Sequence, residues 1–241
     1  MIELKNFSIG FDNRKLLDNV CTIFPSSQLT ALIGRNGTGK STMMKALCGL
    51  NDRYSGEIII EGKNLKDIPR SKLATLVSYV NTQRPRMANL KCNEVVALGR
   101  TPYTNWHGKL SSEDKNQILE AIDLVGMRNY YDRNFNSLSD GESQKIMIAR
   151  AIAQDTPIII LDEPTSFLDM PTRFELANLL RRLAHEKGKT IIFSTHELDL
   201  ALKKSDRVSL VDKGNLYNLS ASEMSESPLL EDLFNSDRLN R

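Results

Sequence analysis

The spacing of apolar residues along the chain predicts strands that alternate with helices. Short apolar runs predict buried strands at residues 30–33, 56–60, 76–80, 158–161, 190–194 and 208–212. Apolar residues recur at helical spacing between several of these runs, at residues 41–50, 174–183 and 198–203. Strands that alternate with helices predict an α/β fold with a mainly parallel sheet.

Three regions depart from this alternation. Residues 2–11 and 16–24 alternate roughly as half-buried strands do, which predicts a β-rich beginning of the chain. Residues from about 90 to 157 are mainly helical, which predicts a helical insertion between strands of one sheet. The last twenty residues are mostly polar, and four apolar residues that lie close together there are expected to form a short docking helix. These four are Leu229, Leu230, Leu233 and Phe234.

Composition narrows the class of protein. Hydrophobic residues make up 40% of the 241 residues and charged residues 26%, which suits a folded, core-forming domain and not a disordered chain. The 32 basic and 30 acidic residues nearly balance, which argues against nucleic acid held by bulk electrostatics. We see no signal peptide and no run of about 18 apolar residues that could span a membrane, so a partner would have to hold the chain at one. The cysteines and histidines are dispersed, which predicts reduced thiols and no metal-ligand cluster.

A glycine-rich loop between a strand and a helix is the first candidate site. Its sequence is Gly34-Arg35-Asn36-Gly37-Thr38-Gly39-Lys40-Ser41-Thr42, which matches GxxxxGK[ST]. Glycines let backbone N–H groups surround a polyphosphate, and the helix N-terminus favours an anion. In this P-loop template Lys40 reaches the β- and γ-phosphates and Ser41 offers a hydroxyl to Mg²⁺. The loop predicts ATP and Mg²⁺ as ligands.

Two carboxylates follow the apolar strand at residues 158–161. They are Asp162 and Glu163, and they should lie at the carboxyl edge of the sheet beside the P-loop. Asp162 could hold Mg²⁺ through water, and Glu163 could orient or deprotonate the attacking water. Without a P-loop, two solvated acids at a strand end would explain them equally well.

A second candidate anion site precedes the helix near residues 146–153. It reads Leu138-Ser139-Asp140-Gly141-Glu142. Ser139 and Glu142 have the spacing of a capping box, which gives the segment a purely structural interpretation. The glycine and the free N–H groups of the helix N-terminus give it a second interpretation as an anion site.

With this segment the chain resembles the ATPases of ABC transporters over about residues 2 to 235. The segment resembles their signature motif, usually written LSGGQ or LSGGE, and the order of all motifs matches the family. The resemblance implies a RecA-like P-loop core, an N-terminal antiparallel β subdomain and an inserted helical subdomain. It implies one domain over residues 1–241, with the core at about 1–88 and 158–241 and the helical subdomain at about 89–157. Asp140 departs from the commoner glycine, so its carboxylate should point away from the γ-phosphate.

The resemblance assigns roles to four more positions. Phe11 corresponds to the aromatic residue that stacks on adenine, although an ordinary core strand residue would also explain it. Gln83 resembles the glutamine that senses Mg²⁺ and the attacking water. Asp169, in the segment Ser166-Phe167-Leu168-Asp169, resembles the D-loop aspartate that crosses to the opposite subunit. His196 resembles the switch histidine that contacts the γ-phosphate.

The family architecture implies the partners. Two copies pair head to tail, so each ATP lies between the P-loop of one copy and the signature of the other. The resemblance further implies membrane permease subunits, an indirect link to a substrate-binding protein, and a peripheral location at the cytoplasmic face of the cell membrane. No nucleic acid is expected.

One segment narrows the choice within the family. Residues 94–103 read Glu-Val-Val-Ala-Leu-Gly-Arg-Thr-Pro-Tyr and resemble the V-x-L-G-R-x-P segment of importers for iron-siderophores, haem and vitamin B12. The same residues also suit an ordinary amphipathic helix start with a proline turn. We therefore expect an importer ATPase for an iron chelate (siderophore or haem) or cobalamin, with an iron chelate first. A soluble ABC ATPase of iron–sulfur cluster assembly is the alternative, and a P-loop kinase or GTPase lacks a signature motif.

Overall fold

The central sheet has six strands in the order β10-β9-β3-β8-β7-β6. The structure is a computed structural model that describes residues 1–11, 14–82, 85, 89–104 and 107–230. The strands are β3 (Leu29–Gly34), β6 (Val77–Val80), β7 (Ile158–Leu161), β8 (Thr190–Ser194), β9 (Arg207–Asp212) and β10 (Asn215–Ser220). All neighbours are parallel except β10, which returns antiparallel to β9. The predicted mainly parallel sheet is confirmed.

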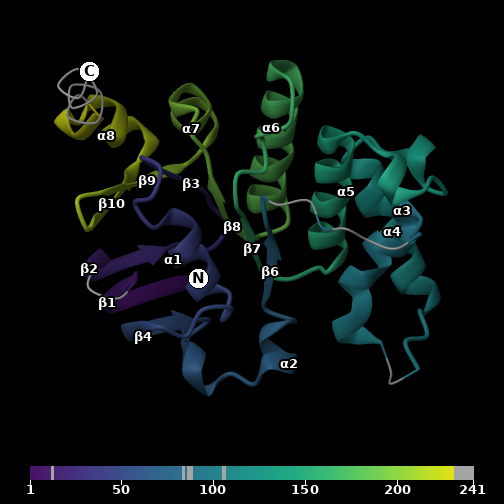
Figure 1. Cartoon of the computed structure of the whole chain (residues 1–241), viewed down its shortest axis with the longest axis horizontal. Helices are drawn as coiled ribbons and strands as arrows, with labels where there is room; N and C mark the ends of the chain where they lie inside the picture. The colour runs from purple at the N-terminus through teal and green to yellow at the C-terminus, as the bar shows by residue number, and fades with distance from the viewer. Residues whose placement is uncertain (12–13, 83–84, 86–88, 105–106, 231–241) are drawn as a thin grey trace.

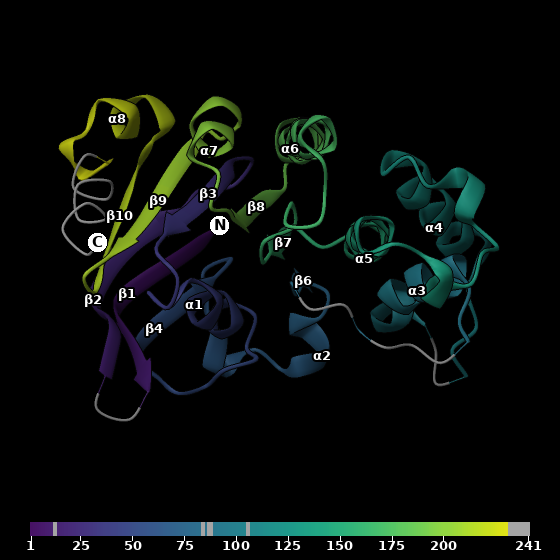
Figure 2. The ribbon, with the colours of Figure 1, turned by 45° about the horizontal axis from the view of Figure 1, so that its top comes forward.

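A smaller antiparallel sheet covers one end of the molecule. Its order is β2-β1-β4-β5, with β1 (Ile2–Phe11), β2 (Arg14–Phe24), β4 (Tyr54–Ile60) and β5 (Lys63–Asn64). It lies beside α1 (Lys40–Leu47) on one face of the central sheet, as Figure 2 shows. The short elements η1 (Leu65–Asp67) and α2 (Arg70–Leu73) follow it. The predicted β-rich beginning is therefore a distinct antiparallel layer.

Each central strand places alternate side chains in two separate cores. Leu32, Ile160 and Ile192 pack with α1 and the antiparallel sheet. Their neighbours Ile159 and Phe193 pack on the opposite face, in the core that contains α6 (Met170–Glu186) and α7 (Leu198–Lys204). Strands buried on both faces explain why these sequence runs are apolar throughout. Helices on both faces leave the edges of the sheet for the loops that carry the predicted motifs.

The predicted helical insertion forms a bundle at the other end of the molecule (Figure 1). It contains α3 (Cys92–Ala97), η2 (Leu98–Tyr103), α4 (Ser112–Leu124), η3 (Arg128–Tyr130), η4 (Phe135–Ser137) and α5 (Asp140–Ala153). Helices α3, α4 and α5 pack against one another, and α5 also packs against the edge strand β6. The insertion is thus joined to the sheet chiefly through α5.

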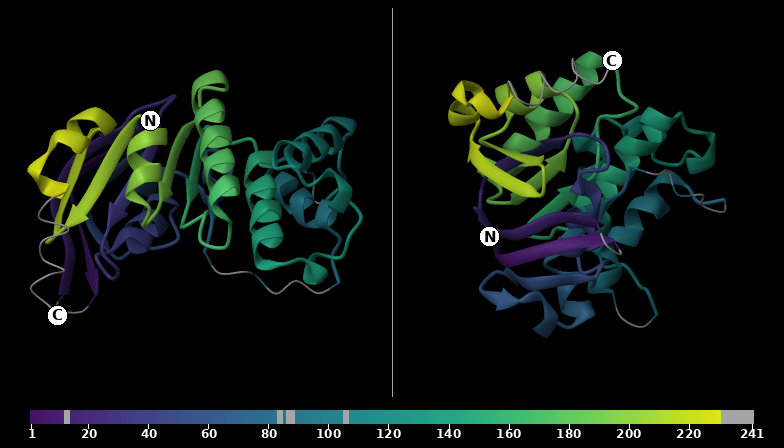
Figure 3. Two further views of the ribbon diagram at one scale, coloured as in Figure 1. Left: turned by 90° about the horizontal axis from the view of Figure 1, so that it is seen from above. Right: turned by 60° about the vertical axis from the view of Figure 1, so that its left-hand side comes forward.

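The structure differs from the prediction at the end of one helix and adds two elements that were not predicted. The helix after the P-loop ends at Leu47 and not at Leu50, because Gly49 adopts a positive φ of 67° and Leu50 N–H caps the Lys45 carbonyl. Leu50 is consequently 65% exposed instead of lying on the apolar face of the helix. At the other end of the chain, β10 and α8 (Ala221–Glu226) were not predicted. Figure 3 shows α8, in yellow, far from the teal helical insertion.

The predicted docking helix lies partly outside the described residues. Leu230 is buried and Leu229 packs against the same core, so both are docked as expected. Leu233 and Phe234 fall outside the residues that the structure describes.

Candidate nucleotide-binding and catalytic site

The P-loop connects β3 directly to α1 and requires glycine at both of its ends. Gly34 has φ 147°, and a Cβ there would lie 2.5 Å from the carbonyl oxygen of Val211. Gly39, the N-cap of α1, has φ 106°, and a Cβ there would lie 2.9 Å from the Cβ of Leu16. The loop is therefore confined by β9 on one side and by β2 on the other. This confinement fixes the two ends of the loop, at Gly34 and Gly39.

The ammonium group of Lys40 lies across this loop. Its Nζ donates hydrogen bonds to the carbonyl oxygens of Gly34, at 2.7 Å, and Arg35, at 3.0 Å. Burial lowers the pKa of Lys40, while the nearby carboxylates of Glu163 and Asp162 oppose that shift. A cation that is bound to backbone carbonyls and lies near the two carboxylates is well placed for an anionic ligand.

The remaining P-loop residues lie at the tip of the loop and in the first turn of α1. Asn36 and Gly37 are exposed at the tip of the loop, and the hydroxyl of Thr38 donates to the Arg35 carbonyl at 2.9 Å. Ser41 and Thr42 lie half-buried in the first turn of α1.

Asp162 and Glu163 lie at the carboxyl end of β7, as expected, and Ser194 holds both of them. The Ser194 hydroxyl donates to Asp162 Oδ1 at 2.8 Å and accepts from the Glu163 backbone N–H at 2.7 Å. Tyr79 donates to Asp162 Oδ2 at 3.4 Å, and burial followed by the charge of Asp162 raises the pKa of Tyr79. Asp162 is only 2% exposed, so its carboxylate is held in one orientation.

Glu163 and His196 meet directly at the sheet edge. His196 Nε2 lies 2.6 Å from Glu163 Oε1, and Ser166 donates to Glu163 Oε2 at 3.1 Å. Glu163 has a φ of 49°, in the left-handed region that non-glycine residues rarely adopt. Such strained backbone is concentrated at functional sites, where surrounding contacts over-determine it. The structure thus brings together Lys40, both acids and the histidine that were separate motifs in the sequence.

Ser194 and Tyr79 were not predicted from the sequence. Ser194 ends β8, which runs parallel to β7 with Leu161 beside Phe193. The following residues, Asp162 and Ser194, must therefore be neighbours. A register argument between the two predicted strands would have found Ser194. Tyr79 gave no such indication, because it reads as an ordinary strand residue.

Two predicted positions have different outcomes. Phe11 ends β1 with 53% of its surface exposed, so the interpretation as a core strand residue is wrong. Its aromatic ring is accessible, as a stacking residue requires. Gln83 lies outside the described residues.

The signature segment forms the capping box that its spacing predicts. Ser139 is the N-cap of α5; its hydroxyl accepts from Glu142 N–H at 3.3 Å, and Ser139 N–H donates to Glu142 Oε2 at 2.8 Å. A hydrogen bond from Tyr130, followed by the bonds from Ser139, lowers the pKa of Glu142. Leu138 is buried and Asp140 is exposed. The structural interpretation therefore holds, and it leaves the anion interpretation open.

Gly141 packs against the D-loop of the same chain. A Cβ at Gly141 would lie 2.8 Å from the carbonyl oxygen of Phe167 and 3.4 Å from Leu168 Cδ2. The signature segment thus contacts Phe167 and Leu168, whereas α1 packs between the central sheet and the antiparallel sheet (Figure 2).

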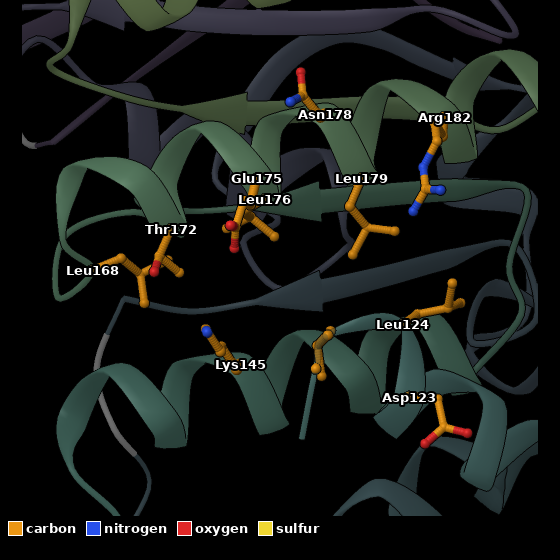
Figure 4. A pocket seen from close by; sticks show the side chains of 12 residues that line it. Asp123, Leu124, Lys145, Leu168, Thr172, Glu175, Leu176, Asn178, Leu179 and Arg182 are labelled. Atoms are coloured by element: carbon orange, nitrogen blue, oxygen red, sulfur yellow. The ribbon is translucent and has the colours of Figure 1, made fainter. Parts of the chain in front are cut away.

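A groove of about 510 Å³ lies between α6 and the helical insertion, away from the two acids (Figure 4). Apolar side chains of Leu168, Leu176 and Leu179 form its wall on the α6 side, and Lys145 and Leu124 lie opposite. Leu168 also belongs to the D-loop, so the groove marks where the helical insertion and the core face each other beyond that loop.

Comparisons with known proteins identify the family. The family model for ABC transporters matches residues 17–166. The chain belongs to this family. Its expected P-loop fold is confirmed, and this ABC protein is an ATPase.

The relatives of this ABC protein include transport ATPases. It is 38% identical to an uncharacterised ABC transporter ATP-binding protein of Methanocaldococcus jannaschii, over 88% of this chain and 73% of the relative. It is 31% identical to the achromobactin transport ATP-binding protein of Dickeya dadantii, over 98% and 88%. It is 30% identical to the iron(3+)-hydroxamate import ATP-binding protein of Bacillus subtilis, over 98% and 88%.

Solved structures of the family share its fold. An inward-facing metal-chelate type ABC transporter matches with a TM-score of 0.84 and 26% identity, over 97% of this chain and 88% of the other. A dimeric ATP-binding cassette in a post-hydrolysis state with ADP and Pi matches with a TM-score of 0.80 and 27% identity, over 92% and 99%. Among the described residues of this chain, none of the helices has the length and apolar character needed to span a bilayer.

Proposed function

We propose that this ABC ATPase powers the import of an iron chelate, a siderophore or haem, or of cobalamin, with an iron chelate as first choice. The observation that carries the proposal is what the named relatives of this chain transport. Transport ATPases for achromobactin, iron(3+)-hydroxamate and petrobactin each match most of the chain, with nearly equal sequence identities of 30% or 31%. The metal-chelate type transporter supports the same class. No such relative supports the alternative of iron–sulfur cluster assembly.

The P-loop side of the site would bind ATP. Residues 34–42 would surround the phosphates with backbone N–H groups, and Lys40 would turn from the carbonyls of its own loop to the β- and γ-phosphates. Phe11 would stack on adenine, since its ring is accessible at the end of β1.

The oxygen ligands at this edge fit Mg²⁺. The Ser41 hydroxyl and the Asp162 carboxylate are hard oxygen donors, and Gln83 would add an amide oxygen. The described residues hold no cluster of three or more metal-binding His, Cys, Asp or Glu side chains. That finding agrees with a cation that takes much of its coordination from phosphates and water. Bound there, Mg²⁺ would neutralise charge that develops on the phosphates.

Glu163 would be the general base. Its carboxylate points to His196, and its backbone N–H is fixed to Ser194. A base held in this way could accept the proton of a water molecule that attacks the γ-phosphate. His196, which shares a hydrogen bond with Glu163, would contact the γ-phosphate and sense its loss.

A second copy would complete each site. The signature segment 138–142 lies with the helical insertion, and the P-loop lies between the two sheets, so we propose that residues 138–142 and Asp169 serve the ATP of the opposite copy. The dimeric cassettes among the solved relatives support a head-to-tail pair. We propose that the core, about 1–88 and 158–241, and the helical part, about 89–157, are the units that move when the pair closes.

The segment at residues 94–103 contains both buried and exposed residues. A Cβ at Gly99 would lie 2.3 Å from the Arg150 carbonyl oxygen, and Arg100 forms a buried ion pair with Asp114 at 2.8 Å. Leu98 and Tyr103 are instead 47% and 41% exposed. We propose that these two apolar side chains contact the permease, while Gly99 and Arg100 shape the segment from inside. Docking of this kind would hold the protein at the cytoplasmic face of the membrane.

Co-purification from the native cell tests the proposed function. The tagged chain should bring down a polytopic permease, with equal numbers of both subunits, and a binding protein that leads to the transported compound. Leu98→Glu should lose the permease while the purified variant still hydrolyses ATP, because Leu98 lies outside the catalytic site. Recovery of the wild type with soluble partners alone would refute the transport function and leave the ATPase chemistry intact.

A further inference from the structure

The D-loop is tied to the switch histidine through two charged residues that no motif contains. Arg173, in the first turns of α6, donates from Nε to the Leu168 carbonyl oxygen at 2.6 Å. Its Nη1 lies 3.2 Å from Glu197 Oε2. Glu197 in turn accepts a hydrogen bond from the buried Thr165 hydroxyl through Oε1, at 3.3 Å. One arginine and one glutamate therefore hold Thr165, directly before the D-loop, and Leu168 within it.

Glu197 is the residue directly after His196, and it is also the N-cap of α7. Its backbone N–H donates to Thr195 Oγ1 at 3.1 Å, so its own position depends on the strand end that carries the histidine. A shift of the D-loop would pull on Glu197 through two contacts. A displacement of Glu197 would move its neighbour His196. Because His196 Nε2 lies 2.6 Å from Glu163 Oε1, the Glu163 side chain would move as well.

The opposite side of the D-loop rests on the signature helix of the same chain. The Phe167 carbonyl lies against Gly141, where no Cβ could fit without a shift. Phe167 itself is 49% exposed and Met170 67% exposed. The loop thus lies between α5 and the switch histidine, with two apolar side chains free to meet a second copy.

We propose that Arg173 and Glu197 form a clamp that transmits the position of the D-loop, and with it the closure of the dimer, to Glu163 and His196. Both are positioning residues, not catalytic ones. The inference rests on the proposed roles of Glu163, His196 and the second copy. The clamp would align the base with water only when the D-loop is seated against the partner.

The contacts fit a geometric role better than a stabilising one. The side chains of Arg173 and Glu197 are 29% and 28% exposed, and ion pairs of such exposure add little to stability. The guanidinium group, however, is rigid and uses two different N–H groups on two different partners. The rigid guanidinium group keeps the Leu168 carbonyl oxygen and the Glu197 carboxylate at a fixed separation. Its loss should therefore disturb the alignment of the D-loop with Glu197 without unfolding the chain.

A double-mutant cycle on ATP hydrolysis tests the clamp. The variants are Arg173→Gln, Glu197→Gln and the double variant, each purified as the full chain. Each single variant should lower kcat about tenfold, because a displacement of a catalytic group by less than about 1 Å should cost less than the roughly hundredfold loss that a displacement of about 1 Å can cause. KM, binding of a fluorescent ATP analogue and the melting temperature should stay at the wild-type values. The double variant should be no slower than the slower single variant, because both remove the same clamp.

Arg181→Gln is the matched control. Arg181 lies on the same helix α6 and faces Asp206 at 3.9 Å, far from the D-loop, so its loss should leave kcat unchanged. Arg173→Lys keeps the charge but not the fork, and it should restore only part of the rate.

The outcomes separate the clamp from the site on which it rests. Normal kcat in Glu197→Gln, or effects of the two substitutions that multiply in the double variant, would overturn the clamp. A Glu163→Gln variant measured alongside reports on the site itself: if it keeps fast hydrolysis, the proposed catalytic roles fail, whatever the clamp variants do.

Discussion

A single hydroxyl group, that of Ser194, holds the two acids of the site in place. It donates to the Asp162 carboxylate and accepts from the Glu163 backbone. Short-range spacing in the sequence was enough to find Lys40 and both acids, since each belongs to a motif of neighbouring residues. Ser194 comes from the next strand, more than thirty residues later, so only the register of two strands could have placed it beside Asp162.

Replacing this serine should weaken both catalysis and folding. In Ser194→Ala, Asp162 Oδ1 and the Glu163 N–H lose their partner in a buried place. We expect kcat to fall about tenfold, as for other residues that orient catalytic ligands, and the free energy of unfolding to fall by about 2 kcal/mol. ATPase assays and denaturant unfolding measure the two effects.

Ser209→Ala is the control for that prediction. Ser209 is fully buried on β9, a strand of the same sheet that β3 separates from β8, and its hydroxyl has no hydrogen-bond partner among the described residues. Its replacement should leave both kcat and stability close to wild type. Equal losses in the two variants would mean that Ser194 contributes only packing.

Among the elements, the helical insertion depends on a buried ion pair. Arg100 Nε donates to Asp114 Oδ1 at 2.8 Å, and Arg100 Nη1 donates to the Ala153 carbonyl oxygen at the end of α5. Hydrogen bonds from Ser111, followed by Arg100, lower the pKa of Asp114 from 3.8 to about 2. The pair therefore joins η2, the N-cap of α4 and the C-terminus of α5.

The stability that Asp114 provides should depend on pH in one direction. Because its pKa is lower in the folded chain, its contribution is complete above about pH 4 and is lost as the pH falls towards 2. Asp114→Asn should lower the free energy of unfolding by about 3 kcal/mol at pH 7, since it leaves Arg100 buried without a counter-charge. Denaturant titrations of both proteins from pH 7 down to pH 3 should show the difference shrinking below pH 4. A difference that stays constant across this range would contradict the role of the ionised carboxylate.

The sequence predicted these elements unevenly. Strands buried on both faces were found, because their apolar runs leave no alternative. Strand β10 was missed, because it is a half-buried edge strand with weak alternation. Its hairpin depends on Lys213 and Gly214, which both adopt positive φ, and Lys213 is an unusual residue for such a turn.

At the scale of the whole molecule, the motifs could be found in the sequence, but the distance between them in the fold could not. The P-loop packs with the antiparallel sheet, and the signature segment belongs to the helical insertion. Periodicity cannot tell how far apart two such segments lie, so a second copy was expected only from the family resemblance. The structure supports that expectation physically, because the P-loop and the signature segment lie in different parts of one chain.

The most direct test of the account is the mass of Glu163→Gln in solution with ATP and Mg²⁺, measured by light scattering after size exclusion. Without the carboxylate that we propose as the general base, the variant should bind ATP, hydrolyse almost none and stay closed, so its mass should be twice the 27.2 kDa of one chain. With ADP it should return to one chain, and Ser139→Arg in the same background should prevent pairing. A single-chain mass with saturating bound ATP would contradict the shared site, and rapid hydrolysis would remove Glu163 from its role.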